Sequence, residues 1–208
     1  MLLPMNLLSS RIHTMSNTSQ EHNKSSEFTS FGAVHLNNTS LKKSTQFWTK
    51  IGGMKLRKTS DTIAEFGTEN KTLIVVHFKA KVPYKKGYSG LYHVAIHVPS
   101  KAEFANILYR LIVKNYPFSP IDHTMSKSIY LDDPDGINIE FTLETPERIK
   151  RVITEGGLRM EDTDGTIRAA SAHLNIREVL KDLVDKDVTK NTPKDFFIGH
   201  LHLYATHI

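Results

Sequence analysis

The chain has 208 residues, of which 39% are hydrophobic and 24% are charged, a balance that indicates a globular protein with one large domain or two small ones. The absence of cysteine excludes disulfides, thiolate metal ligands and cysteine nucleophiles, and no run of roughly 18 apolar residues could cross a membrane. The net charge of +5 is modest and its positive segments are scattered, so we expect neither a nucleic-acid nor a membrane partner.

The first 27 residues are predicted to be a disordered N-terminal segment. Residues 16–30 are almost entirely polar, and such a stretch cannot bury enough apolar surface to fold. Residues 1–8 superficially resemble a secretory signal, but the stretch is too short, contains Pro4 and lacks a charged start. The lack of cysteines fits a cytoplasmic protein, which is the location we expect.

Residues 28–145 are predicted to form one α+β domain from two repeated units. The first unit has a strand at 31–36, a helix that Thr39 or Ser40 can cap and that Gly52 and Gly53 end, and strands at 54–58, 62–66 and 72–78. The second unit has a strand at 91–98, a helix at 101–113 that Ser100 caps, an extended stretch at 118–123 and strands at 128–131 and 137–143. The repeat is roughly 55 to 60 residues long, and each unit must bury a sheet face against another unit.

The last two strands of the second unit form a predicted hairpin with a carboxylate in an unusual position. Its turn is the segment DDPDG at 132–136, in which Pro134 fixes φ and Gly136 supplies a positive φ. Glu140 then lies in the middle of a strand, where glutamate is rare and costly to bury without a partner. Either that strand face is solvated, or Glu140 binds a metal ion.

Residues 146–196 are predicted to be a charged linker with one helix, at 175–184. Strand character returns at 197–208, where the segment IGHLHL at 198–203 repeats the segment FGAVHL at 31–36. A strand cannot fold without partner strands, so we expect 197–208 to be the first strand of a truncated second domain of a longer protein.

Four segments carry a resemblance to a known family: GLYHVAI at 90–96, DH at 122–123, YLDDPDGINIE at 130–140 and IGHLHL at 198–203. In this order they resemble the vicinal oxygen chelate superfamily, which includes glyoxalase I, extradiol dioxygenases and antibiotic-resistance proteins. Within it, the chain looks like the bacterial catechol 2,3-dioxygenase type. The resemblance implies the α+β fold of tandem βαβββ units (the glyoxalase/bleomycin-resistance/extradiol dioxygenase fold) over about residues 28–208.

The resemblance also implies a metal ion held by the first and last strands of neighbouring units. In the register of the repeats, His93 and His200 take the first-strand position and Glu140 takes the last-strand position. The first unit has Ala33 and Ile74 at these positions, and neither can coordinate a metal. The implied ligands are therefore His93, Glu140 and His200.

A second ligand set remains open from the sequence. It consists of His35, His93 and Glu140, all within the first two units, and it requires a ligand shifted by two positions along its strand. Residues i and i+2 of a strand face the same side, so His35 and His202 could also point into a pocket without being ligands.

Two further side chains match the dioxygenase pattern. The resemblance implies that Tyr130 hydrogen-bonds a substrate oxygen or its metal-bound neighbour, and that His123 is the acid–base group. Histidine suits this role because its pKa lies near working pH. We assign His77, His97 and His207 to structure or surface.

The resemblance implies an extradiol ring-cleaving dioxygenase that uses Fe(II), or Mn(II) in its place, to cleave catechol or a substituted catechol with O2. The expected partners are a small aromatic diol and O2 in aromatic hydrocarbon catabolism, and the sequence is compatible with a homo-oligomer. We expect the chain itself to be inactive or weakly active, because much of two units is missing. The alternatives are a glyoxalase-like metal-dependent lyase or isomerase, for which Ile74 offers no fourth ligand, and a non-catalytic binding or resistance protein for a small aromatic ligand.

Overall fold

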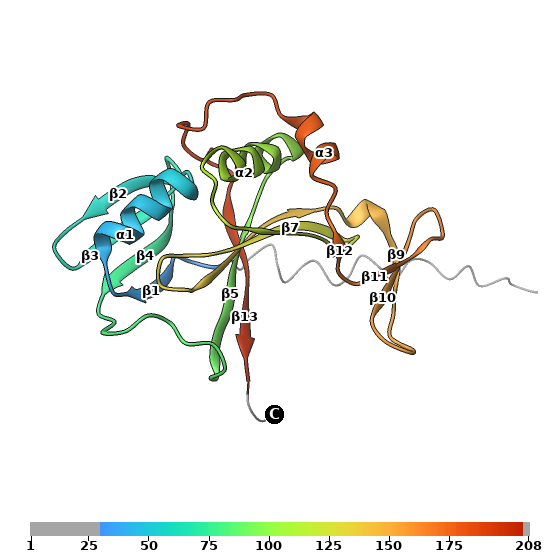
Figure 1. The fold of residues 1–208 in the computed structure, drawn as a ribbon, viewed down its shortest axis with the longest axis horizontal. Coiled ribbons are helices and arrows are strands. Elements are labelled where there is room, and N and C mark those ends of the chain that lie inside the picture. Colours follow the sequence, from blue (N-terminus) through green and yellow to red (C-terminus); the bar gives the residue numbers. More distant parts are fainter. Residues whose placement is uncertain (1–29, 206–208) are drawn as a thin grey trace, which may run out of the picture. The chain divides into compact units, whose positions relative to one another are not determined.

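A computed structural model describes residues 30–205, and Figure 1 shows its elements. The predicted disordered segment 1–27 and His207 lie outside the described residues. The elements belong to one compact unit, Phe31–Ile208. No helix in the described part of the chain is long and apolar enough to span a membrane.

The first βαβββ unit forms a four-stranded sheet. Its elements are β1 (Val34–Asn38), α1 (Leu41–Gln46) with a following π-helical turn (Phe47–Ile51), β2 (Lys55–Thr59), β3 (Ile63–Gly67) and β4 (Thr72–Phe78). The strand order is β1-β4-β3-β2, and β1 runs parallel to β4. Of the two predicted cap residues, Ser40 is the cap, since its hydroxyl accepts a hydrogen bond from the backbone N–H of Lys43.

The second unit repeats this order inside a six-stranded sheet. Its elements are β5 (Gly90–His97), α2 (Lys101–Val113), β6 (Ser119–Asp122), β7 (Ser126–Asp132) and β8 (Asn138–Glu144). The sheet order is β12-β6-β7-β8-β5-β13, with β5 and β8 parallel. The predicted helix at 101–113 and its Ser100 cap are confirmed, and the α+β fold of tandem βαβββ units is as expected.

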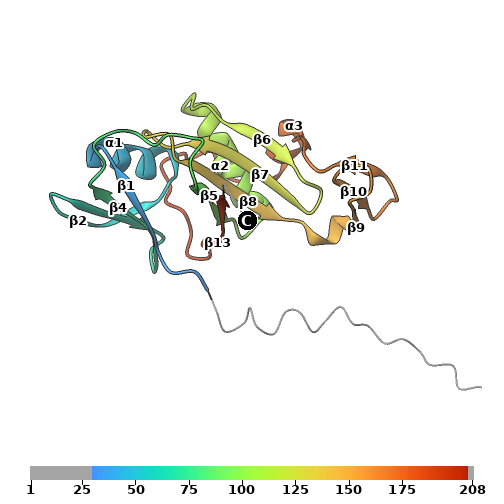
Figure 2. The ribbon, with the colours of Figure 1, turned by 90° about the horizontal axis from the view of Figure 1, so that it is seen from below.

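The core lies between the helices and one face of each sheet. Figure 2 shows α2 lying across the six-stranded sheet, and the apolar face of α2 is buried there. The side chains of one continuous buried cluster come from both units, for example Trp48 and Phe66 from the first and Phe104, Leu108 and Phe141 from the second. Burial of this apolar surface is the main force that holds the two units together.

The turn between β7 and β8 also connects the two units. The Asp133 carboxylate accepts hydrogen bonds from the backbone N–H groups of Asp135 and Ile137, and Gly136 takes the positive φ of 85° that the turn requires. The same carboxylate accepts a hydrogen bond of 2.6 Å from Asn38 at the end of β1. The turn therefore closes the hairpin and binds the first sheet.

The segment 146–196 contains more structure than a linker with one helix. It forms β9 (Ile149–Ile153), β10 (Arg159–Asp162) and β11 (Ile167–Ala169), which make a three-stranded sheet, then β12 (Ala172–His173) and the short α3 (Ile176–Val179). The β10–β11 turn repeats the aspartate turn of β7–β8, because the Asp162 carboxylate accepts from two backbone N–H groups and Gly165 has a φ of 84°. The sequence signal for this hairpin is thus DTDG at 162–165, beside DPDG at 133–136.

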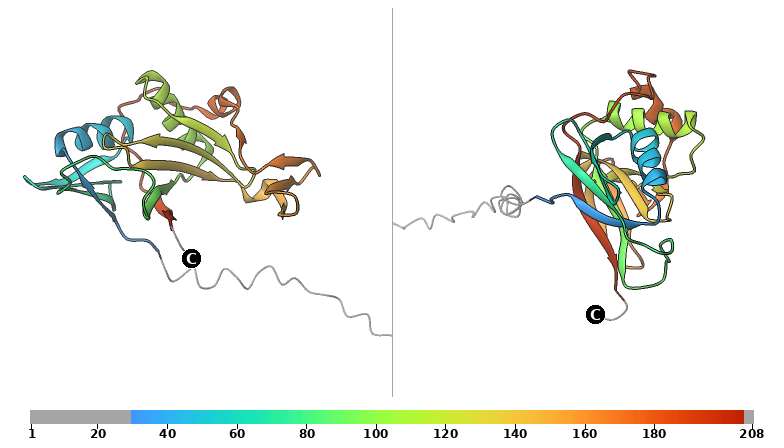
Figure 3. Two further views of the ribbon diagram at one scale, coloured as in Figure 1. Left: turned by 60° about the horizontal axis from the view of Figure 1, so that its bottom comes forward. Right: turned by 90° about the vertical axis from the view of Figure 1, so that its left-hand side faces the viewer.

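Strand β13 (Phe197–Tyr204) is where strand character was predicted, and it completes the six-stranded sheet. It pairs antiparallel with β5, with register shifts between Ile198 and His200 and between His202 and Leu203. Figure 3 shows the red β13 alongside the green β5. Its assignment to a second domain stays a prediction.

Strand pairing corrects one position in the repeat register. Leu36 pairs with Val76 in the first unit, and its equivalent Ile96 pairs with Phe141 in the second. The first-unit equivalent of Glu140 is therefore Val75, and the prediction of Ile74 was wrong by one residue. The prediction aligned the two units at the turns that precede their last strands. It failed because this turn is shorter in the first unit. Neither residue offers a metal ligand, so the conclusion drawn from Ile74 is unchanged.

Candidate metal centre

Three neighbouring strands bring His93, Glu140 and His200 to one face of the six-stranded sheet. Ala95 of β5 pairs with Glu140 of β8 on one side and with His200 of β13 on the other. His93 lies two residues before Ala95 and so shares its face. The methyl group of Ala95 leaves room above the sheet, where the longer side chains of its neighbours converge.

The donor atoms of the three side chains meet at one point. Oε2 of Glu140 lies 2.9 Å from Nε2 of His93 and 3.3 Å from Nε2 of His200, and the two imidazole nitrogens are 3.2 Å apart. Among the described residues, this is the one group of three or more metal-binding side chain types that converges in this way.

Burial and charge make the carboxylate of Glu140 unusual. Its side chain is only 4% exposed, which rules out the explanation of a solvated strand face. Burial by itself raises the pKa of Glu140, but hydrogen bonds from His200, His93, Ser128 and Thr142 outweigh it and hold the pKa below its usual range. The carboxylate therefore stays ionised in a buried position.

This donor set fits a divalent metal ion. Two ligands at about 2.1 Å from one ion and at right angles to each other lie roughly 3.0 Å apart, close to the three observed separations. Two imidazoles and one carboxylate on one side of an ion form the facial arrangement of non-haem Fe(II) oxygenases. A cation there would also balance a buried anion. The side chains present thus suit a metal with open coordination positions.

Tyr130 and His123 extend this group toward a cavity. Tyr130 pairs with Glu140 across β7 and β8 and donates a hydrogen bond of 2.9 Å to its Oε1. Nε2 of His123 lies 3.1 Å from the Tyr130 hydroxyl. Burial first, and then the charge of Glu140, raise the pKa of Tyr130 well above its usual range, so its hydroxyl keeps its proton.

The loop that carries His123 is held by the segment predicted to be a linker. Nδ1 of His123 lies 2.7 Å from the carbonyl oxygen of Ala170, and because a carbonyl only accepts, this nitrogen carries the proton. The next residue, Thr124, has a φ of 66°, a strained value for a β-branched residue that costs roughly 1–3 kcal/mol. The carboxylate of Asp122 offsets this by accepting from the Thr124 N–H.

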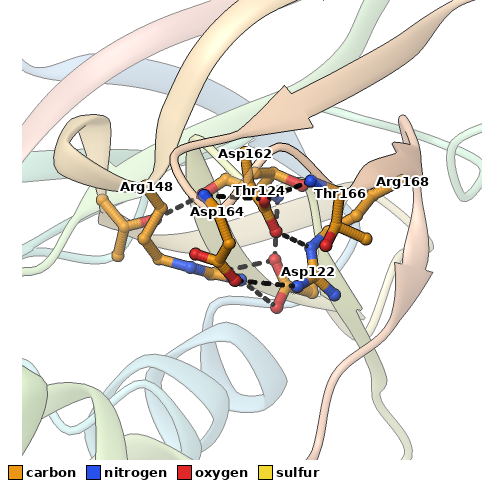
Figure 4. Close-up of polar contacts among 8 residues, drawn as sticks. Asp122, Thr124, Arg148, Asp162, Asp164, Thr166 and Arg168 are labelled. Atoms are coloured by element: carbon orange, nitrogen blue, oxygen red, sulfur yellow. Dashed lines mark hydrogen bonds and ion pairs between the residues drawn. The ribbon is translucent and has the colours of Figure 1, made fainter.

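Figure 4 shows how the three-stranded sheet supports this loop. Arg148 makes two hydrogen bonds to Asp122, of 3.0 and 2.9 Å, and its carbonyl accepts from Thr163 in the β10–β11 turn. In the same turn Asp162 forms an ion pair with Arg168. The segment after β8 therefore fixes the backbone on which His123 sits.

A cavity of about 340 Å³ is lined in part by Tyr130. Its lining mixes aromatic, polar and basic side chains, among them Lys86, Tyr92, Ser119, His123, Tyr130 and Asn138. Its volume is in the range of small-molecule sites. The cavity and the three donor side chains thus meet at Tyr130.

The structure separates the two ligand sets that the sequence left open. His35 lies in the four-stranded sheet, where its Nδ1 is 2.8 Å from Nε2 of His77 and the two rings stack, and it is not part of the converging group. His200 takes the third place instead. His202 packs edge-on against Tyr92 and His93 without joining the group.

One side chain near the site was missed by the sequence analysis. His97, assigned to structure or surface, lies with its Nε2 3.3 Å from Nδ1 of His200 and its Nδ1 3.5 Å from Glu144. The spacing of His93 and His97 did not predict that both rings approach His200. Residues four apart share a face only where the strand is regular.

Comparison with known proteins gives a consistent result. Residues 30–141 match the family model described as the glyoxalase/bleomycin resistance protein/dioxygenase superfamily. Over 183 residues the chain is 30% identical to a catechol-2,3-dioxygenase of Bacillus subtilis, a match that covers 86% of this chain and 61% of that relative. The chain thus spans less than two thirds of the length of this curated relative.

Solved structures of the superfamily also match. A glyoxylase/bleomycin resistance protein/dioxygenase domain from Frankia sp. is 20% identical with a TM-score of 0.48, covering 56% of this chain and 93% of that one. A lactoylglutathione lyase from Agrobacterium tumefaciens is 18% identical with a TM-score of 0.44, covering 54% and 92%. On the family model that matches more than half of its residues, the chain belongs to the glyoxalase/bleomycin resistance protein/dioxygenase superfamily.

Proposed function

We propose that this chain carries an Fe(II) centre for the extradiol cleavage of a catechol by O2, with His93, Glu140 and His200 as the metal ligands. The observation that carries the proposal is the convergence of these three donors on one face of the sheet, next to a cavity. The similarity to a catechol-2,3-dioxygenase supports the same reaction. Mn(II) would suit the same mixed nitrogen and oxygen donors.

When bound, Fe(II) supplies neighbouring coordination positions for the two oxygen atoms of a catecholate and for O2. The protein contributes binding, orientation and proton handling. The aromatic rings of Tyr92 and Tyr130 offer flat surfaces for a small aromatic ring in the cavity. Lys86 lies on the same wall, where its ammonium group forms an ion pair of 3.3 Å with Asp132.

His123 and Tyr130 can manage the substrate protons. The single hydroxyl hydrogen of Tyr130 has two acceptors within reach, Oε1 of Glu140 and Nε2 of His123. With its Nδ1 proton held by Ala170, His123 accepts or returns a proton at Nε2, the nitrogen that faces the cavity wall. His123 is thus the proposed acid–base group, and Tyr130 orients an oxygen of the substrate.

The test is iron content and catechol turnover of the full chain after anaerobic loading with Fe(II). We expect about one iron per chain. Because the three donors and the cavity all lie within the described residues, we also expect turnover, in place of the weak or absent activity expected from the sequence, followed as the absorbance of the yellow ring-opened semialdehyde. Glu140→Gln should lose the iron, whereas His123→Gln should keep it and lose turnover by about 100-fold or more. His77→Phe is the matched control, because it removes an imidazole from the other sheet.

Two results would overturn the proposal. One is an iron content that Glu140→Gln leaves unchanged, because the buried carboxylate would then not be a ligand. The other is a chain that binds iron and catechol without turnover, which would favour the non-catalytic binding protein of the alternatives.

A further inference from the structure

Gly199 and His97 form a close contact directly beside the candidate ligand His200. A Cβ atom at Gly199 would come within 2.0 Å of Cδ2 and 2.1 Å of Nε2 of His97, far closer than any real contact. The register of β13 against β5 shifts at this point, between Ile198 and His200. Glycine is therefore required here for space, so that the His97 ring can lie against the backbone of β13.

The His97 ring bridges a carboxylate and His200. Its Nε2 lies 3.3 Å from Nδ1 of His200, and its Nδ1 lies 3.5 Å from Oε1 of Glu144. The ring is largely buried, since only 13% of the side chain is exposed, and it packs on Phe197 with ring centroids 5.2 Å apart. The order of polar groups is therefore Glu144, His97, His200 and then Glu140.

The direction of these contacts follows from what each group can donate. If Nε2 of His200 binds the metal, its lone pair is used there and the proton of the neutral ring lies on Nδ1. Nδ1 of His200 is then the donor and Nε2 of His97 the acceptor, which places the proton of His97 on its Nδ1, toward Glu144. Nε2 of His200 is the nitrogen facing Glu140 and His93. Ligating histidines commonly donate their other N–H to a partner that fixes ring and tautomer.

We propose that His97, seated over Gly199 and backed by Glu144, is a positioning residue that holds the His200 ring with its Nε2 lone pair toward the metal centre. The inference rests on the proposed function, because it presupposes that His200 is a metal ligand. His200 needs this support because its side chain is 44% exposed, whereas that of His93 is 5% exposed. A half-exposed ring on the last strand would otherwise lose more rotamer freedom on binding.

The first experiment measures the Co2+ affinity of the full chain, using the visible absorption of the bound ion and competition with a chelator. His97→Phe keeps a ring but has no acceptor, so Co2+ binding should weaken about 10–100-fold. His97→Gln should stay within about threefold of the wild type, because an amide oxygen can accept the same hydrogen bond. His77→Phe is the remote control and should change nothing, and thermal melts of the metal-free proteins verify folding.

A double-mutant cycle tests the contact with Gly199. Gly199→Ala should weaken Co2+ binding at least about tenfold in the wild-type background, because the new methyl group displaces His97. In the His97→Ala background the same change should cost no more than about threefold, since no ring is left to displace.

The possible failures can be told apart. If the wild type binds no Co2+ at a ratio of one per chain, both the proposed function and this inference fall. If the wild type binds Co2+ and Glu140→Gln does not, but His97→Phe binds as tightly as the wild type, only the inference falls. Equal losses in His97→Gln and His97→Phe would also overturn it, because packing rather than hydrogen bonding would then explain the effect.

Discussion

The two βαβββ units share one frame, and only the second carries the candidate site. In each unit a serine cap lies four residues after an equivalent strand position, Leu36 in the first unit and Ile96 in the second, and the helix begins at the next residue. At the positions of His93, Ala95 and Glu140 the first unit has Ala33, His35 and Val75. In the described chain the first sheet also has no equivalent of β13, because β1 is its edge strand. The first unit therefore lacks both the ligand side chains and the strand that carries the third ligand.

The position of Ala95 is as informative as the ligand positions. In the second unit this small residue lies between Glu140 and His200 and leaves space above the sheet. In the first unit His35 fills that position and contacts His77 from β4. His35 lies on β1, the edge strand of the first sheet, and its imidazole takes up the room that the methyl group of Ala95 leaves open in the second unit. The first unit thus lacks the donors and also the space.

The turns before the last strand differ in the same way. In the first unit the buried hydroxyl of Thr68 accepts from the N–H groups of Asn70 and Lys71, at 3.4 and 3.2 Å. In the second unit the Asp133 carboxylate makes two such bonds of 2.9 Å and a third to Asn38. Hydrogen bonds to a charged acceptor are stronger, so the turn beside the candidate site is the more rigid one.

The largest effect is expected when the carboxylate of the second unit, Glu140, is introduced at the equivalent position of the first unit. Val75→Glu places an ionised group at a buried position opposite His35, whose ring is already engaged with His77, and we expect a loss of about 3–5 kcal/mol in the free energy of unfolding. Val75→Met, of similar size but uncharged, is the control, and denaturant unfolding is the measurement. Equal effects of the two substitutions would mean that this face is hydrated and that the comparison fails.

The two turns give a matched pair of variants. Asp133→Ala leaves buried donors of Asp135, Ile137 and Asn38 without their acceptor, so it should cost about 2–4 kcal/mol. Thr68→Ala should cost only about 1 kcal/mol. Both free energies come from denaturant unfolding at neutral pH. A larger loss for Thr68→Ala would show that the first turn, not the second, limits stability.

The second unit alone is supported at its edge by Arg148, and this support should depend on pH. Burial raises the pKa of Asp122, but hydrogen bonds from Arg148 and Thr124 outweigh it and lower the pKa on balance. A lowered pKa in the folded state contributes stability above the unfolded pKa, and this is lost as pH falls through the folded value. Arg148→Met should therefore cost about 1 kcal/mol near pH 7 and progressively less as Asp122 becomes protonated.

Urea unfolding of the wild type and Arg148→Met between pH 7 and pH 2 measures this difference. Lys181→Met, which removes an exposed ion pair with Glu178, serves as the reference for an ordinary surface charge. A cost for Arg148→Met that stays constant over the whole range would assign its effect to packing.

The smallest expected effect concerns the first turn of each helix. α2 has an acidic residue there, Glu103, whereas α1 has none and carries Lys43 at the equivalent position. Because a negative charge is favourable at a helix N-terminus, Lys43→Glu should stabilise the chain by roughly 0.5 kcal/mol at low salt. High salt should remove the gain, and Lys43→Gln should give about half of it. A loss of stability would show that Lys43 has another partner.

Hydrophobic periodicity and capping predicted both βαβββ units, because short-range patterns determine them. The sequence also pointed to His93, Glu140 and His200, since the repeat places them at equivalent strand positions. The choice between His35 and His200 depended on how β13 pairs with β5, over more than one hundred residues of chain, and local patterns do not encode such pairings.

The strands of the segment 146–196 were not predicted from the sequence, for a different reason. They are short and charged, so alternation of apolar and polar residues is weak there. The clearest signal was the repeated aspartate turn at 162–165, which forms the same hydrogen bonds as the turn at 133–136. His97 was missed because its role depends on the register shift at Gly199, a tertiary feature.

The placement of His200 on β13 has a consequence for the order of events during synthesis. His93 and Glu140 are in place once β8 has folded. The third ligand, His200, arrives only with β13, the last strand of the described chain. A ligand that binds only the completed sheet stabilises it and so shifts the folding equilibrium toward the completed sheet. If the proposed centre binds iron, iron capture would act as a checkpoint on completion of the sheet, and iron starvation should leave β13 undocked and open to proteases while the rest of the sheet stays protected.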